Sequence, residues 1–422
     1  MPPHALLDTA ADLLRTLLHF DHPADAVVSR YFRGHHRLGP RERAALTETV
    51  YTVLRRKVLF DYFALSGTGP HERRLAILGF AGPRDFLCAA LDQTERGWLA
   101  ACDAADVTQL PPACRHNLPD WLAARLARQL GDSEFTALAA SLLESAPLDL
   151  RVNALQGKRE AVRAELGAAG IATEPTPYSP WGLRVAGKPA VNRLDAFRRG
   201  AVEVQDEGSQ LLALLTDARR GQMVADFCAG AGGKTLALGA AMRSTGRLYA
   251  VDVSAHRLAA LEPRLARSGL SNVYPVAVAH ERDERIGRLA GKMDRVLVDA
   301  PCSGLGTLRR NPDLKWRQSE SAIAGLAVKQ SAILTGAARL VKPGGRLVYA
   351  TCSLLADENE SIAAAFGAAH PDFAPAPVAE ILQSLKVSSA AALCGENGWY
   401  LRLWPHRHAT DGFFAAAWTR GQ

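Results

Sequence analysis

The chain has 422 residues, with 50 Lys and Arg against 43 Asp and Glu and a net charge of +7. This length predicts two or three domains, and the small basic excess weakly favours a polyanionic partner. With no apolar run of 18 residues, no signal-peptide layout and no C-x-x-C pair among seven cysteines, the sequence argues against a membrane span, a disulfide framework and a zinc ribbon. We therefore expect a cytoplasmic protein without a bound metal.

Residues 1–145 have the pattern of a helical domain. Apolar residues recur every three or four positions along the first expected helix, at Leu6, Ala10, Leu13, Leu14 and Leu17. Residues 30–57 hold eight Lys or Arg against two Glu, beside His35 and His36. This basic run is either a phosphate-contacting face or an ordinary solvated surface, and the sequence favours neither interpretation over the other. The His pair has no second ligand cluster nearby, so we expect a surface pair rather than a metal site.

The sequence pattern changes over residues 146–205 and predicts a small α+β module there. A strand is expected at 148–155 and a helix at 159–170. Short strands are expected at 183–185 and 201–205, and the proline-rich stretch 174–180 is expected to be a loop.

Residues 206–422 alternate between apolar strands and helices. The expected strands are 223–227, 248–251, 273–278, 296–298 and 347–349. The clearest helices follow Ser254 and span 319–340, and a hairpin of 399–404 with 412–418 closes the chain. This alternation predicts an α/β fold with a doubly wound parallel sheet.

Polar residues follow four of these strands where the strands end. The stretch 228–234 follows the first strand, and Asp252, Asp299 and Cys352 end three others. The ends of parallel strands lie along one edge of the sheet, where ligands bind at the switch point. The sequence therefore predicts a site at that edge.

The glycine turn at Gly230, Gly232 and Gly233 admits three cofactor interpretations. A dinucleotide fingerprint lacks its third glycine, because Thr235 stands there. A Walker A loop matches at Gly233-Lys234-Thr235 but needs a glycine where Cys228 stands. The third interpretation is S-adenosylmethionine, with its ribose hydroxyls on an acid that ends the second strand, the place of Asp252.

Two of the cysteines lie in turn-forming surroundings. Cys302 stands in Pro-Cys-Ser-Gly and Cys352 in Thr-Cys-Ser. Free cysteines are usually small core residues, which fits Cys88, Cys102 and Cys114 in their apolar helical runs. It fits Cys302 and Cys352 poorly, and two thiolates without His partners make a poor zinc site.

At these residues the sequence resembles the Nop/Sun family of RNA cytosine-C5 methyltransferases. The resemblance rests on D-F-C-A-G-A-G-G-K-T, V-D-V-S, D-A-P-C-S-G, R-R-N-P-D-L-K-W, Y-A-T-C-S-L-L-A-D-E-N-E and D-G-F-F, and covers roughly residues 202–418. It is most similar to the branch acting on bacterial small-subunit (16S) ribosomal RNA, whose helical leading domain resembles NusB. The implied fold is a class I methyltransferase, Rossmann-like sheet in residues 206–422, after a NusB-like RNA-binding domain.

The resemblance also implies residue roles. Cys352 is the nucleophile that adds to cytosine C6, Cys302 assists release of the methylated base, and Asp299 lies against both cofactor and cytosine. The residues implied to hold S-adenosylmethionine are Cys228, Ala229, Gly230, Ala231, Gly232, Gly233, Lys234, Asp252, His280 and Asp299. Two positions depart from the family pattern, because Ala231 replaces a proline and Ala279-His280 replaces Gly-Asp.

We therefore expect an S-adenosylmethionine-dependent RNA cytosine-C5 methyltransferase that acts on 16S rRNA. The alternatives are a transfer RNA methyltransferase, an RNA-dependent NTPase of P-loop type and a non-catalytic RNA-binding assembly factor. A monomer is expected, because the sequence shows no heptad seam.

Overall fold

The computed structural model describes residues 1–395 and 397–422 and divides into two compact units. The first unit comprises residues 1–145 and 307–320, and the second comprises residues 146–306 and 321–422. The segment 307–320, which contains R-R-N-P-D-L-K-W, was expected to lie in the methyltransferase domain but groups with the helical unit. The other limits of the three predicted domains stay predictions.

The first unit is built from short helices. Their bounds are α1 Pro3–Leu17, α2 Ala24–Gly34, α3 Pro40–Arg55, α4 Lys57–Ala64, α5 His71–Leu78, α6 Arg84–Cys88, α7 Gln93–Ala104, α8 Pro112–His116, α9 Asp120–Leu130, α10 Asp132–Leu142 and α18 Leu314–Arg317. Proline stands in the first turn of α1, α3 and α8, where its missing N–H has no intrahelical partner to lose. The predicted leucine stripe of α1 is buried in the core of this unit.

The segment 307–320 is bonded into this helical unit by its side chains. Lys315 is 2% exposed, and its ammonium group donates to the carbonyls of Arg55 at 2.8 Å and Asn117 at 2.6 Å. The indole N–H of Trp316 donates to the Leu54 carbonyl at 2.9 Å. Burial holds the pKa of Lys315 well below its usual range. The segment therefore satisfies backbone groups that the helices leave unpaired.

The second unit begins with a four-stranded antiparallel sheet. Its elements are β1 Leu148–Val152, α11 Arg159–Ala168, β2 Thr173–Pro175, β3 Gly182–Val185, α12 Asp195–Arg198 and β4 Val202–Val204. The strand order is β2-β3-β1-β4, the β-α-β-β-α-β arrangement of ferredoxin-like modules. The predicted α+β module is confirmed, but the predicted loop 174–180 begins inside β2. Because β2 lies at the edge of the sheet, the missing N–H of Pro175 removes no hydrogen bond on the side where β2 has no partner strand.

A larger sheet of eight strands follows. Its strands are β5 Met223–Asp226, β6 Arg247–Asp252, β7 Val273–Ala277, β8 Met293–Asp299, β9 Val341–Thr351, β10 Phe373–Pro375, β11 Tyr400–Leu403 and β12 Phe413–Arg420. The order is β10-β12-β9-β8-β5-β6-β7, with β11 also paired to β12. Strands β9, β8, β5, β6 and β7 are parallel, which confirms the predicted sheet. The chain order reverses between β5 and β8, so the switch point lies there.

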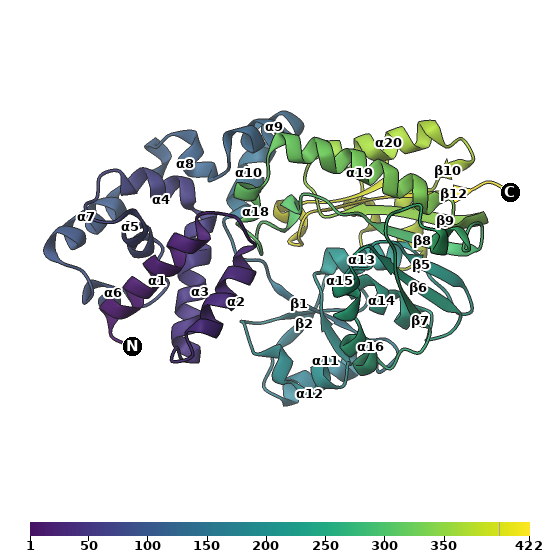
Figure 1. The fold of residues 1–422 in the computed structure, drawn as a ribbon, viewed down its shortest axis with the longest axis horizontal. Helices are drawn as coiled ribbons and strands as arrows, with labels where there is room; N and C mark the ends of the chain where they lie inside the picture. The colour runs from purple at the N-terminus through teal and green to yellow at the C-terminus, as the bar shows by residue number, and fades with distance from the viewer. Residues whose placement is uncertain (396) are drawn as a thin grey trace. The chain divides into compact units, whose positions relative to one another are not determined.

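Helices cover both faces of this sheet (Figure 1). Helices α13 Glu207–Leu215, α14 Gly233–Ala241 and α21 Val378–Ser384 pack on one face, and α19 Glu320–Ala338 and α20 Glu360–Ala369 on the other. The remaining helices are α15 Ala255–Ala259, α16 Glu262–Ser268, α17 Glu284–Gly287 and α22 Pro405–His408. Within residues 1–395 and 397–422, no helix is both long and apolar enough to cross a membrane.

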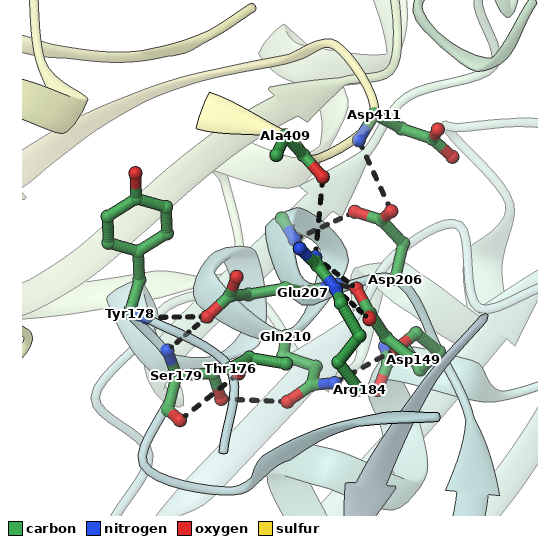
Figure 2. A network of polar contacts seen from close by, with 12 residues as sticks. Asp149, Thr176, Tyr178, Ser179, Arg184, Asp206, Glu207, Gln210, Ala409 and Asp411 are labelled. Atoms are coloured by element: carbon green, nitrogen blue, oxygen red, sulfur yellow. Dashed lines mark hydrogen bonds and ion pairs between the residues drawn. The ribbon is translucent and has the colours of Figure 1, made fainter. Parts of the chain in front are cut away.

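A buried polar network joins the small module to α13 (Figure 2). Asp149 on β1 accepts from the guanidinium of Arg184 on β3 at 2.8 Å. The carboxylate of Glu207, at the start of α13, accepts the Ser179 N–H at 2.7 Å, and the Ser179 hydroxyl donates to the Gln210 side chain at 2.7 Å. Burial raises the pKa of Glu207. The network fixes the module against the helix that opens the larger sheet.

We predict that Lys315→Ala lowers the free energy of unfolding by about 2–3 kcal/mol, because two buried carbonyls lose a hydrogen-bond donor. Thermal and urea denaturation followed by far-ultraviolet circular dichroism measure the change. The control is Lys342→Ala, which removes an ion pair to Asp294 from a side chain that is 45% exposed. We expect the control to change stability by less than about 1 kcal/mol. Equal effects of the two substitutions would contradict the structural role of Lys315.

Candidate functional site

The glycine turn after β5 wraps closely around its neighbours. Gly230 and Gly232 have φ of +56° and +83°, in the left-handed region that favours glycine. A side chain at Gly232 would collide with Leu261. Gly230 donates its N–H to Asp252 at 2.8 Å, and Asp252 also accepts the Ser254 N–H at 2.8 Å. The acid that ends β6 therefore holds the turn in shape.

A buried carboxyl group lies beneath this turn at the end of β5. Asp226 is 1% exposed and accepts the hydroxyl of Thr235, on α14, at 2.7 Å. Burial raises the pKa of Asp226 to about 7, and the nearby carboxylates of Asp299 and Asp252 add to the shift. The hydrogen bond from Thr235 opposes the rise without cancelling it. This group is therefore half protonated near neutral pH.

An ion pair links the glycine turn to the end of β8. The ammonium group of Lys234 lies 2.7 Å from a carboxylate oxygen of Asp299, and the two side chains are 11% and 30% exposed. Burial alone would lower the pKa of Lys234, but the attraction and hydrogen bond of Asp299 raise it, and the charge of Cys352 raises it further. Lys234 therefore stays positively charged at this edge of the sheet.

The two cysteines selected from the sequence meet in space. Cys302 follows β8 and Cys352 follows β9, and their sulfur atoms lie 3.3 Å apart. The hydrogen bond to Cys352, loss of water and the charge of Cys352 hold the pKa of Cys302 well above its usual range. Cys302 therefore keeps its proton in this pair.

A cavity of about 450 Å³ opens at this edge of the sheet. Of the residues predicted from the sequence, Cys228, Asp252, Asp299, Cys302 and Cys352 line it. Cys228 is a third thiol here, but loss of water and the charge of Asp299 raise its pKa well above the usual range. Cys228 therefore stays neutral, unlike a nucleophilic cysteine.

Other residues of the cavity were missed by the sequence interpretation. Glu281, Arg257 and Lys329 supply charged groups, and Val253 is an apolar wall residue that is 60% exposed. His280 is not among the lining residues, and its ring nitrogen accepts the N–H of Arg282 at 3.1 Å. The family pattern has an acid where His280 stands. Glu281, one position later, is the acid that the sequence offers in its place.

Comparison with known families places the chain. Residues 213–419 match the model described as 16S rRNA methyltransferase RsmB/F, and residues 118–192 match the ferredoxin-like domain of RsmF/B-like methyltransferases. A probable ribosomal RNA small subunit methyltransferase B of Synechocystis is 31% identical over 439 residues, which cover 96% of this chain and 97% of the relative. The chain belongs to the RsmB/F family.

Two further likenesses agree with RsmB/F membership. The ribosomal RNA small subunit methyltransferase B of Sodalis glossinidius is 38% identical over 258 residues, which cover 61% of this chain and 59% of the relative. The crystal structure of PH0851 is 27% identical, covers 99% of both chains and superposes with a TM-score of 0.80. The RsmB/F family depends on S-adenosylmethionine, so this cofactor, rather than a dinucleotide or ATP, is the one that the chain uses.

The cavity of this RsmB/F chain suits S-adenosylmethionine in its chemistry. Asp252 and Glu281 offer carboxylates to hydroxyl groups, and Phe227, Val253 and Val278 offer apolar surface to an aromatic base. The carboxylates along the wall also suit the positive charge of a sulfonium.

We predict that Asp226→Asn changes the pH dependence of stability. The folded-state pKa of about 7 lies above the unfolded value of about 4, so the folded state binds more protons between these values. The contribution of Asp226 to the free energy of unfolding has its highest value below pH 4 and falls as the pH rises toward 7. The amide that replaces the carboxyl group lacks this titration, so the variant should gain stability relative to the parent chain over that window. Melting temperatures between pH 4.5 and 7.5 test this, and parallel curves would contradict it.

Proposed function

We propose that this RsmB/F chain methylates C5 of a cytosine in 16S rRNA through a covalent bond between Cys352 and cytosine C6. The observation that carries the proposal is the pair of sulfur atoms 3.3 Å apart, in one cavity with Asp252 and Asp299. Cytosine C5 is a poor nucleophile, and a thiolate added at C6 makes it enamine-like. A methyltransferase that used only one thiol would not need the second cysteine at this distance.

The charges around the pair give the thiols different tasks. Lys234 keeps its positive charge beside the pair. The thiolate of Cys352 forms the bond to C6. S-adenosylmethionine, when bound, supplies an electrophilic methyl group for C5. Asp299 faces the same cavity and stabilises a proton at N3 of the base while charge develops on the ring.

Cys302 completes the cycle after the bond to Cys352 has formed. The charge of Cys352 is one cause of the raised pKa of Cys302, and a thioether at Cys352 removes that charge. Cys302 then loses its own proton to water more readily and, as a thiolate, accepts the proton from C5. The C5–C6 double bond re-forms, the C6–sulfur bond breaks, and Cys352 leaves as a thiolate.

We further propose that residues 1–145 bind RNA and that the chain acts as a cytoplasmic monomer. Of the basic run, Arg30, Arg33, Arg37 and Arg41 are exposed, whereas Arg55 is buried. The exposed arginines suit phosphate contacts that do not depend on base sequence. The target cytosine must leave its stack to reach the cavity.

We predict that Cys352→Ser abolishes methyl transfer, because serine is a much weaker nucleophile, and that Cys302→Ser accumulates a covalent RNA–protein adduct. Incubation with labelled S-adenosylmethionine and unmodified 16S rRNA, followed by nucleoside analysis and denaturing gels, reads both outcomes. The double variant should form no adduct. Label in 5-methylcytidine of transfer RNA but not of 16S rRNA would favour the transfer RNA alternative, and normal turnover by both single variants would refute the mechanism.

We predict that Glu281→Ala weakens S-adenosylmethionine binding at least about tenfold, roughly the loss of one charge-assisted hydrogen bond. His280→Ala is the matched control, because His280 does not line the cavity. Isothermal titration calorimetry on the two variants measures the dissociation constants. A larger loss for His280→Ala would restore the role that the family pattern gave to position 280.

A further inference from the structure

A buried carboxylate lies between the two cysteine loops. Glu358 belongs to the 3₁₀ turn Ala356–Glu358, which follows β9, and its side chain is 0% exposed. One carboxylate oxygen accepts the N–H of Ser303 at 2.8 Å, and the other accepts the Ser303 hydroxyl at 2.5 Å. Ser303 directly follows Cys302, so Glu358 holds the residue next to that cysteine by two bonds.

The same carboxylate also holds the second loop. The oxygen that accepts the Ser303 hydroxyl also accepts the hydroxyl of Ser353, the residue that directly follows Cys352. The hydroxyl oxygens of Ser303 and Ser353 lie 3.2 Å apart. One buried carboxylate therefore bonds the residues that follow both cysteines.

A glutamine bonds Glu358 to the residue that precedes Cys302. Gln330, on α19, is 0% exposed and donates its side-chain amide to Glu358 at 3.0 Å and to the Pro301 carbonyl at 3.0 Å. Cys302 is thus flanked by two residues that are bonded, directly or through Gln330, to Glu358. The Tyr349 hydroxyl donates to the Glu358 carbonyl at 2.6 Å, which ties the turn itself to β9.

Each loop also has supports that do not involve Glu358. The Gly306 N–H donates to the Cys352 carbonyl at 2.8 Å, and the guanidinium of Arg402 donates to the Leu354 carbonyl at 2.8 Å. Loss of the Glu358 bonds would therefore leave the loops folded while loosening the side-chain link between them. Charge-assisted bonds are the strong kind, and misplacement of reacting groups by about 1 Å can cost about 100-fold in rate.

We propose that Glu358 is a positioning residue that sets the distance between the thiols of Cys302 and Cys352. The proposal rests on the proposed function for the use of that distance in catalysis. The geometry itself does not depend on the reaction, since it is carried by Ser303 and Ser353. Glu358 touches neither thiol and acts through the backbone that carries them.

The first test is Glu358→Gln in the full chain. The amide keeps the shape of the side chain but cannot accept the same set of donors on two oxygens. We expect kcat to fall about 10- to 100-fold, while the dissociation constant for S-adenosylmethionine changes less than about twofold. Glu380→Gln is the matched control, because Glu380 is an exposed carboxylate on α21, and we expect its kcat to match that of the parent chain.

The second test reports on the distance between the two thiols and does not depend on methyl-transfer activity. Phenylarsine oxide condenses with two neighbouring thiols to form two arsenic–sulfur bonds and one water, and so requires both sulfur atoms close together. The parent chain should bind one equivalent at this pair, and Cys302→Ser should remove that binding. Glu358→Gln should weaken it at least about tenfold, whereas a loss of overall stability alone would leave it unchanged below the melting temperature.

The outcomes separate this proposal from the proposed function. If the parent chain binds the arsenical but transfers no methyl group, the function fails and the thiol measurement still tests Glu358. A folded Glu358→Gln with unchanged kcat and arsenical affinity overturns the proposal. If Glu358→Gln does not fold, Ser353→Ala removes one donor to the same carboxylate. Its arsenical affinity should fall in the same direction by a smaller factor, and no change there also overturns the proposal.

Discussion

The ion pair of Lys234 with Asp299 is the interaction on which the site depends. The glycine turn follows β5 and Asp299 ends β8, so the pair spans the switch point of the sheet. It joins the helix that follows the glycine turn to the strand that leads into Cys302. A neutral residue at either position would leave a largely buried charge without its partner.

Three thiols surround one cavity, and their neighbours make them chemically different. Cys228 is cut off from water and lies among the carboxylates of Asp299, Asp226 and Asp252, and both conditions disfavour its ionisation. Cys302 is held neutral chiefly by Cys352 itself, so its acidity depends on what has happened to its partner. Burial and the neighbouring charges, rather than the thiol itself, thus set how readily Cys228 and Cys302 ionise.

The sheet and the grouping of the site were predictable because they follow local rules. Apolar runs gave the strands, and parallel strands must bring their ends to one edge, which explains why Asp299, Cys302 and Cys352 meet. A count of positions could not distinguish His280 from Glu281, because the curve of the loop after β7 decides which side chain faces the cavity. Glu358 stands in a run of polar residues typical of an exposed helix start, and only the tertiary fold shows it buried.

The segment 307–320 groups with the helical unit although roughly 160 residues separate it from the end of residues 1–145. During synthesis the leading helices emerge first, but the donors that Lys315 and Trp316 supply to them arrive only after residues 146–306 of the second unit have been translated. At about 5–20 residues per second this interval lasts on the order of 10–30 s. Until that segment has been synthesised, the carbonyls of Arg55 and Asn117 in the helical unit lack the hydrogen bonds that Lys315 donates to them.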